Sequence, residues 1–161
     1  MRGTDYESVD GGYNTSFICG IIGFTESGQK ENAEREKLMY CRGIRGATTV
    51  DHNDREEILA ATTELLRLMV LENNVLVEDI ASASFTVTDD LDAVFPAQAA
   101  RQIGWNEVAL ICMREIPVPN SLSKCIRVLL LVNTTRSASE IQHVYIHKAA
   151  GLRPEFEPET K

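Results

Sequence analysis

The sequence predicts an α+β domain with about five strands, one long helix and one short helix. Five runs rich in β-branched, aromatic and other apolar residues alternate in the manner of strands. One long stripe of apolar residues instead recurs at helical spacing. The chain has 161 residues, of which 43% are hydrophobic. That size and composition are typical of a single domain built around one core.

The composition divides the chain into three parts. Residues 1–38 carry scattered glycine, serine, asparagine and acids, and we expect them to form a flexible N-terminal extension. Their apolar island at residues 17–24 is too short to span a membrane and lacks the flanks of a secretory signal. Because Met39 stands just before the first predicted strand, translation could begin there, and we expect residues 1–38 to be dispensable. The working domain is predicted at residues 39–154, followed by a flexible tail at residues 155–161 with almost no apolar content.

The first predicted strand, residues 40–50, carries two arginines between glycines. Alternation places Arg45 on one face with Gly43 and Ala47, and Arg42 on the other face. Small neighbours leave room beside Arg45, which makes it the candidate for binding an anion, whereas Arg42 is interpreted as structural or as lying at the subunit surface. A glycine in a strand also fits a bulge or tight packing, so this pattern alone is weak.

A long helix is predicted to follow. Residues 51–57 combine side chains that cap helices with acids in the first turn, where negative charge complements the helix dipole. The helix should end near Asn73 and Asn74. Its apolar stripe is predicted to lie in the core and comprises Ile58, Leu59, Leu65, Leu66 and Met69.

The remaining elements are shorter. A strand at residues 80–88 should precede a turn at Asp89 and Asp90. Pro96 fits the first turn of a short helix at the rim of the sheet, and Gly104 would close that helix. Further strands are predicted at residues 107–114, 125–134 and 143–147.

The strand at residues 125–134 is apolar on both faces, so both faces are predicted to be covered. Arg127 is the exception, because a guanidinium in such surroundings needs an anionic partner or water. A structural ion pair with Glu115, at the end of the preceding strand, is one explanation. Tyr145 as a core aromatic and Arg153 as a solvated charge have similarly ordinary explanations.

Charge and cysteine spacing exclude several function classes. The net charge of -8 argues against broad binding to nucleic acid or anionic membranes. The cysteines show no CxxC spacing, which favours a reduced, cytoplasmic protein without a metal site: Cys19, Cys41, Cys112 and Cys125. His143 and His147 have the spacing of a helical metal pair, but they fall in a predicted strand.

No arrangement of serine, histidine and acid, no phosphate-binding GxxxxGK[ST] loop and no paired carboxylates are recognisable. The arginines instead suggest a cofactor-free pocket for a small polyanion. Any chemistry there would come from positioning and electrostatics.

Five separated segments carry a resemblance to a known family. They are RGIRGATT at residues 42–49, AVFPAQAAR at 93–101, CMREI at 112–116, KCIRVLLLV at 124–132, and HVY with GLRP at 143–145 and 151–154. In this order they resemble the monofunctional, trimeric, bacillus-type chorismate mutases of the pseudo-α/β-barrel class. The resemblance implies a mixed sheet, a homotrimer with sites at subunit interfaces, and conversion of chorismate to prephenate with neither cofactor nor metal. The pathway implied is phenylalanine and tyrosine biosynthesis.

The resemblance also implies roles for individual residues. Arg127 would be the main catalytic residue, donating to the ether oxygen of chorismate as its C–O bond breaks, and Glu115 would accept from the substrate hydroxyl. Arg45 and Tyr145 would bind a carboxylate. Cys112 would lie close to Glu115 and also contact the substrate. Three further residues would come from an adjacent subunit: Phe95, Ala97 and Arg101. Leu152 and Arg153 would close over the substrate from a mobile segment.

Two positions depart from the family pattern. Gln98 stands where members often have a lysine, and Ile111 stands where a small polar residue is common. Both differences bear on substrate affinity more than on the catalytic step. The alternative function, from another class, is a non-catalytic trimer that binds a small carboxylate with the same interfacial arginines.

Overall fold

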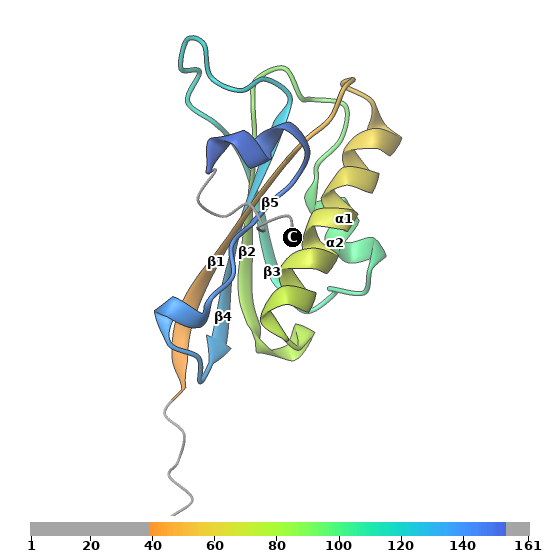
Figure 1. Ribbon diagram of the computed structural model, residues 1–161. Coiled ribbons are helices and arrows are strands. Elements are labelled where there is room, and N and C mark those ends of the chain that lie inside the picture. The colour runs from red at the N-terminus through yellow and green to blue at the C-terminus, as the bar shows by residue number, and fades with distance from the viewer. Residues whose placement is uncertain (1–38, 154–161) are drawn as a thin grey trace, which may run out of the picture. The chain divides into compact units, whose positions relative to one another are not determined.

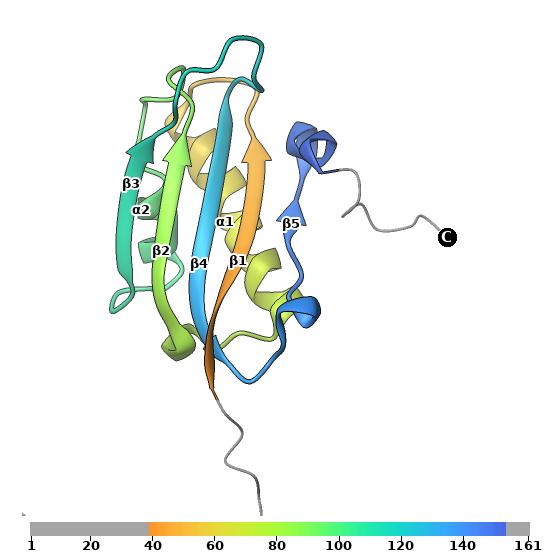
Figure 2. The same cartoon turned by 90° about the vertical axis from the view of Figure 1, so that its left-hand side faces the viewer.

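The computed structural model describes residues 39–153. The predicted extension at residues 1–38 and the predicted tail at residues 155–161 lie outside the described residues. Within the described part, one sheet carries both α-helices on the same face (Figure 1). Figure 2 shows the strands in front of the two helices, so the other face of the sheet is turned toward the viewer.

The sheet is mixed, as predicted, and has five strands in the order β3-β2-β4-β1-β5. Strand β4 runs antiparallel to both β1 and β2, whereas the pairs β2–β3 and β1–β5 are parallel. The edges of the sheet are therefore β3 and β5. The strands are β1 (Tyr40–Thr49), β2 (Ile80–Val87), β3 (Ala109–Arg114), β4 (Cys125–Thr134) and β5 (Val144–Tyr145).

Two strand predictions were too long. The strand predicted at residues 107–114 begins only at Ala109, after a bend over residues 106–108. The strand predicted at residues 143–147 is confined to Val144 and Tyr145. His147 has φ 53, which is left-handed backbone incompatible with a strand, and it begins the 3-10 helix η3 (His147–Leu152).

Helix α1 (Arg55–Asn73) begins and ends where the sequence predicts. The Asp54 side chain caps it by accepting from the backbone N–H groups of Glu56 and Glu57, both acids of the first turn. A cap of this kind is worth about 1 kcal/mol. Asn74 closes the helix in the left-handed conformation, with φ 48 and ψ 45, which asparagine tolerates well.

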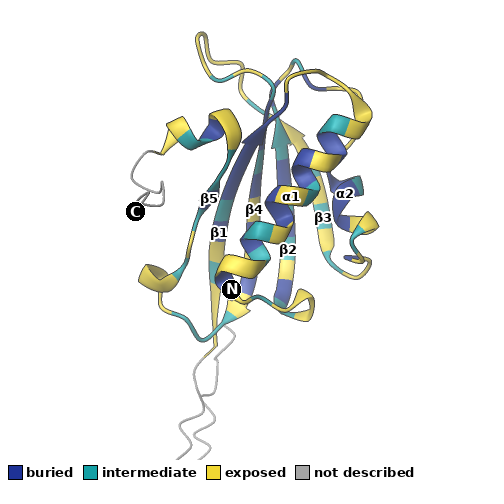
Figure 3. Ribbon diagram, turned by 45° about the vertical axis from the view of Figure 1, so that its right-hand side comes forward, coloured by how far each residue is buried: buried dark blue, intermediate teal, exposed yellow. Residues whose placement is uncertain are grey.

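The core lies between α1 and the sheet, and Figure 3 shows the buried side of α1 turned toward the strands. The apolar stripe of α1 is buried as predicted, and it packs on buried residues of β1, β2 and β4 such as Ile44, Phe85 and Leu130. Gly46 lets the helix come close, because a Cβ at this position would lie 2.4 Å from Met69 Sδ. Of the uses left open for the glycines of β1, tight packing is therefore the one found at Gly46.

Helix α2 (Ala97–Gln102) is the predicted short helix. Pro96 lies at its N-cap, one residue before the predicted place, and Gly104 follows the helix with φ 93. Small buried side chains let it pack near α1 and the edge strand β3: Ala97, Ala99 and Ala100. Across residues 39–153, no helix combines the length and apolar character needed to cross a membrane.

The second face of the sheet is covered in the described chain only beside η3, where Cys125 of β4 is buried with Ala47 and Ala149. The prediction that both faces of β4 are covered therefore fails in one copy for the rest of this face. Leu129 and Leu131 of β4 are 40% and 37% exposed. On β3, Ile111 and Met113 are 54% and 44% exposed. We call this surface the open face. Exposed apolar side chains gathered on neighbouring strands of one face favour an interaction site.

Candidate active site

A pocket of about 550 Å³ lies on the open face, where β1, β2 and β4 meet η3 and the residue after it. Three arginines line it, and none of its described lining residues is acidic. It therefore presents concentrated positive charge, which favours an anionic ligand. We call it the arginine pocket; it is lined by Arg45, Gly46, Ser84, Thr86, Met113, Arg127, Val128, Leu129, Tyr145, Leu152 and Arg153.

Strand register brings the charged residues together. Ala47 of β1 pairs with Arg127 of β4 on one side and with Tyr145 of β5 on the other. Arg45 lies two residues before Ala47 and so shares its face of the sheet. The small side chain of Ala47 thus lies between the larger polar side chains of Arg45, Arg127 and Tyr145. The alternation of residues 43–47 predicts that Arg45 and Ala47 share a face.

Arg127 and Glu115 form an ion pair: Nη1 of Arg127 donates to Oε2 of Glu115. The other carboxylate oxygen, Oε1, accepts from the Thr86 hydroxyl at 2.6 Å. The Glu115 side chain is only 16% exposed and that of Arg127 is 35% exposed, so the pair is partly sheltered from water. Sequence reasoning missed Thr86; its register opposite Arg127 on β2 is what places it there.

Two pKa shifts fix the charges near the pocket. Partial burial of Arg127 disfavours its charge, but the hydrogen bond that Arg127 donates to Glu115 and the nearby acidic groups together outweigh this effect, so the net pKa of Arg127 is raised. Arg127 is therefore a permanent cation. Burial raises the pKa of the neighbouring Cys125 thiol to about 11. A thiol protonated at neutral pH is a poor nucleophile, so Cys125 is not suited to nucleophilic attack.

His143 orients the backbone at Arg45. Its Nδ1 accepts a hydrogen bond of 3.2 Å from the Arg45 backbone N–H. In the neutral ring the proton must then be on Nε2. Sequence reasoning gave His143 no role at the site, because the contact joins residues 98 positions apart.

We expect His143 to titrate below its usual value of 6.5, because burial and then the cations Arg45 and Arg153 lower its pKa. A histidine whose pKa is lowered by folding stabilises the fold while neutral. That contribution is present above pH 6.5 and is lost as the pH falls through the lowered pKa. Imidazole NMR titration gives the midpoint, and urea unfolding at several pH values gives the stability.

The control for this prediction is His143→Gln, whose amide oxygen still accepts from the Arg45 N–H but does not titrate in this range. The variant should show a weaker loss of stability between pH 7 and pH 5 than the parent protein. A His143 midpoint at or above 6.5, or identical pH dependence in the two proteins, would contradict the prediction.

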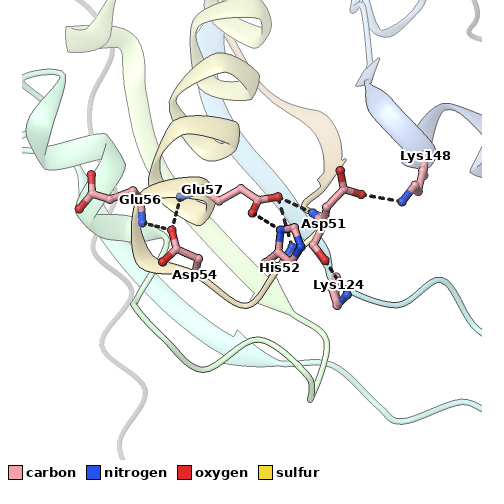
Figure 4. A network of polar contacts seen from close by, with 7 residues as sticks. All are labelled: Asp51, His52, Asp54, Glu56, Glu57, Lys124 and Lys148. Atoms are coloured by element: carbon pink, nitrogen blue, oxygen red, sulfur yellow. Dashed lines mark hydrogen bonds and ion pairs between the residues drawn. The ribbon is translucent and has the colours of Figure 1, made fainter.

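A polar network at the start of α1 holds η3, the 3-10 helix that ends at Leu152, just before Arg153. Lys148 Nζ lies 2.7 Å from Asp51 Oδ1, and the Lys148 backbone N–H donates to the Thr49 hydroxyl. Figure 4 shows Asp51 joined on its other side to Glu57 of α1. The hydrogen bond from Lys148, followed by its charge, lowers the pKa of Asp51. The chain that carries Arg153 is thus tied to the end of β1.

The other predicted residues lie elsewhere in the single chain. Phe95, which is 75% exposed, and Cys112 line a second cavity of about 500 Å³ beside α2 and the edge strand β3. We call it the Phe95 groove; it is lined by Arg55, Val87, Leu91, Asp92, Ala93, Val94, Phe95, Pro96, Gln98, Cys112, Met113 and Arg114. Burial raises the pKa of the Cys112 thiol, so it too is neutral near pH 7.

Three predicted residues line neither cavity. Ala97 is buried in α2, Arg101 is exposed at the end of that helix, and Glu115 reaches the arginine pocket only through Arg127. The predicted site residues therefore form two groups in one copy of the chain. Met113 lines both cavities, so both reach the edge strand β3.

Comparisons with known proteins agree over the described domain. The family model for chorismate mutase type I matches residues 41–156. The chorismate mutase AroH of Bacillus subtilis (strain 168) is 46% identical over 119 residues, covering 73% of this chain and 94% of that protein. The AroH protein of Thermus thermophilus is 50% identical over 117 residues, covering 72% and 96%. A solved chorismate mutase from Clostridium thermocellum is 53% identical, with a TM-score of 0.67, over 68% of this chain and 97% of that one.

Proposed function

Since the chain belongs to the chorismate mutase type I family, we propose that its arginine pocket is where chorismate is converted to prephenate. The chain is a chorismate mutase, an isomerase of aromatic amino-acid biosynthesis. The observation that carries the assignment of the site is the Arg127–Glu115 pair, set in a pocket with two further arginines and no acidic lining residue among those described.

The pocket suits a compact dianion. Its volume of about 550 Å³ is within the range of small-molecule sites. Arg45 and Tyr145 bind one carboxylate of chorismate, and the guanidinium fork of Arg45 matches the two oxygens. Arg153 and Leu152, at the end of η3, close over the bound substrate. Water excluded by this closure strengthens every charge interaction in the pocket.

The reaction is a rearrangement within one molecule: a C–O bond breaks while a C–C bond forms. Negative charge develops on the ether oxygen, and Arg127 donates to that oxygen. Glu115 and Thr86 hold the guanidinium in place before the substrate arrives, so little reorganisation is needed in the transition state. Each carboxylate oxygen can accept more than one hydrogen bond, so Glu115 also accepts from the substrate hydroxyl.

We also propose that the enzyme is a homotrimer, in which the Phe95 groove of one copy completes the arginine pocket of the next. The open face supports this, since its apolar residues are exposed in a single chain: Ile111, Met113, Leu129 and Leu131. Assembly would bring Phe95, Cys112 and Arg101 to the substrate held by Arg45 and Arg127. A stable interface needs a buried apolar centre of this kind.

Two further assignments belong to the same proposal. Residues 39–154 form the catalytic domain, which fits the family match at residues 41–156. A cytoplasmic location fits the thiols, because the cysteines among the described residues are free: Cys41, Cys112 and Cys125.

The experiment that tests the site combines an assay with a mass measurement. Loss of the chorismate diene absorbance gives turnover, and sedimentation equilibrium should give a mass near three times the 17.9 kDa of one chain. If the wild-type protein turns over chorismate and Arg127→Ala does so equally well, the assignment of the pocket is wrong. A fully active monomer would contradict the shared site.

A further inference from the structure

The Phe95 groove is lined by both apolar and charged side chains. Its apolar side chains include Phe95, which is 75% exposed in the single chain. Its lining also includes two guanidinium groups, from Arg55 and Arg114, and the amide of Gln98. An exposed aromatic ring beside cations is suited to a flat apolar ring that carries a carboxylate.

Arg55 is a poor choice for the stability of its own helix. It is the first residue of α1, where the positive end of the helix dipole disfavours a cation. The next two residues, Glu56 and Glu57, are the acids expected there. Its Nε lies 3.8 Å from Glu56 Oε1, but with side chains 50% and 85% exposed such a pair contributes little. Helix stability therefore does not explain Arg55.

The contact that does orient Arg55 comes from the other helix. Its Nη2 donates to Oε1 of Gln98 in α2 at 3.0 Å. A neutral amide fixes the plane of the guanidinium without neutralising its charge. Arg55 therefore keeps a full positive charge in a defined orientation at the groove, and a guanidinium has five N–H donors with which to bind.

The other charged residues of the groove are placed differently. Asp92 is the one carboxylate among its described lining residues, and it accepts from the Asn53 side chain at 2.6 Å. Arg114 ends the edge strand β3 and is exposed. Arg55 thus has a fixed orientation that comes from both α-helices.

We infer that Arg55, oriented by Gln98, is a substrate-binding residue that contacts a carboxylate of chorismate from the Phe95 groove. The inference rests on the proposed function, in which the groove of one copy faces the arginine pocket of the next. The substrate carries two carboxylates, and Arg55 adds a cation from the neighbouring copy to those of the arginine pocket. Its contribution is to binding, because the charge on a carboxylate is the same in the ground state and the transition state.

The test is steady-state kinetics of Arg55→Ala. We expect the KM for chorismate to rise about tenfold or more, with kcat changed by less than about threefold, because a charge-assisted hydrogen bond made in both states is lost. Arg55→Lys keeps the charge but not the planar fork, so its KM for chorismate should rise less than that of Arg55→Ala. Gln98→Ala, which frees the guanidinium, should also raise KM, by less than Arg55→Ala.

Arg67→Ala is the matched control, because Arg67 is an exposed arginine farther along α1 and lies outside both cavities. It should leave KM and kcat unchanged. Circular dichroism and sedimentation establish that each variant is folded and assembled. A KM for Arg55→Ala within about threefold of wild type would overturn the inference, as would a fall in kcat that exceeds the rise in KM.

The failure of this inference and the failure of the proposed function are distinguishable. If the wild type turns over chorismate and loses activity on Arg127→Ala, but Arg55→Ala leaves KM unchanged, only the role of Arg55 is wrong. If wild-type turnover survives Arg127→Ala, the assignment of the arginine pocket is wrong, and the role of Arg55 falls with it.

Discussion

Replacing Arg127 with alanine is expected to lower kcat for chorismate by about 10³-fold while the protein stays assembled. The variant removes the proposed donor to the ether oxygen, where charge develops only as the C–O bond breaks. An interaction confined to the transition state acts on kcat rather than on KM. Arg127→Lys should be almost as inactive, because an ammonium cannot hold Glu115 and the substrate together as a planar fork does.

Stability must be followed in the same variants. Arg127→Ala leaves Glu115, which is 16% exposed, with the Thr86 hydroxyl but without its cation, so some loss of thermal stability is expected. Arg67→Ala serves as the control for loss of an arginine. Circular dichroism and sedimentation separate unfolding from loss of catalysis. A folded Arg127→Lys enzyme with kcat within about tenfold of wild type would contradict the proposed role.

Replacing Leu131 with aspartate is expected to dissociate the assembly and to lower kcat/KM by about 100-fold or more. Leu131 lies on the open face, in register with Gly43 and Ser82, and it does not line the arginine pocket. A carboxylate buried without a partner at an interface costs several kcal/mol. Once separated, each chain keeps its arginine pocket but loses the groove that completes it.

Sedimentation and the chorismate assay, run at the same protein concentration, check this prediction. Leu71→Asp is the control, because Leu71 is 66% exposed on α1 and lies on the helical side of the sheet. It should remain trimeric and active. A Leu131→Asp protein that still sediments as a trimer with full activity would show that the open face is not the interface.

Local chemistry made several elements predictable. Helix α1 was located by Asp54 and the acids after it, because capping and the dipole act over a few residues. Strand alternation separated the two arginines of β1. Arg42 donates to the Arg136 carbonyl and lies 4.5 Å from the centroid of the Tyr40 ring, contacts that agree with the structural one of its two interpretations. Arg45 lines the arginine pocket, while its role toward substrate stays a prediction.

What the sequence could not predict depends on long-range contacts. An apolar strand face is normally covered, but its residues do not show whether the same chain or another copy covers it. For this reason the exposure of Leu129 and Leu131 in a single chain could not be predicted. Thr86 gains its place beside Glu115 from strand register. Arg55 gains its orientation from Gln98, 43 residues away. None of these contacts has a signal in local composition or periodicity.

The position of β1 in the sheet has a consequence for how the protein is made. The first strand of the described domain is hydrogen-bonded on both sides by strands from the other end of the chain, β4 and β5. Until the ribosome has made residues 125–134, β1 has neither neighbour. Closing such long loops is entropically costly and tends to slow folding. The arginine pocket, divided among β1, β4 and β5, therefore cannot form on a nascent chain until residues 125–153 have been synthesised.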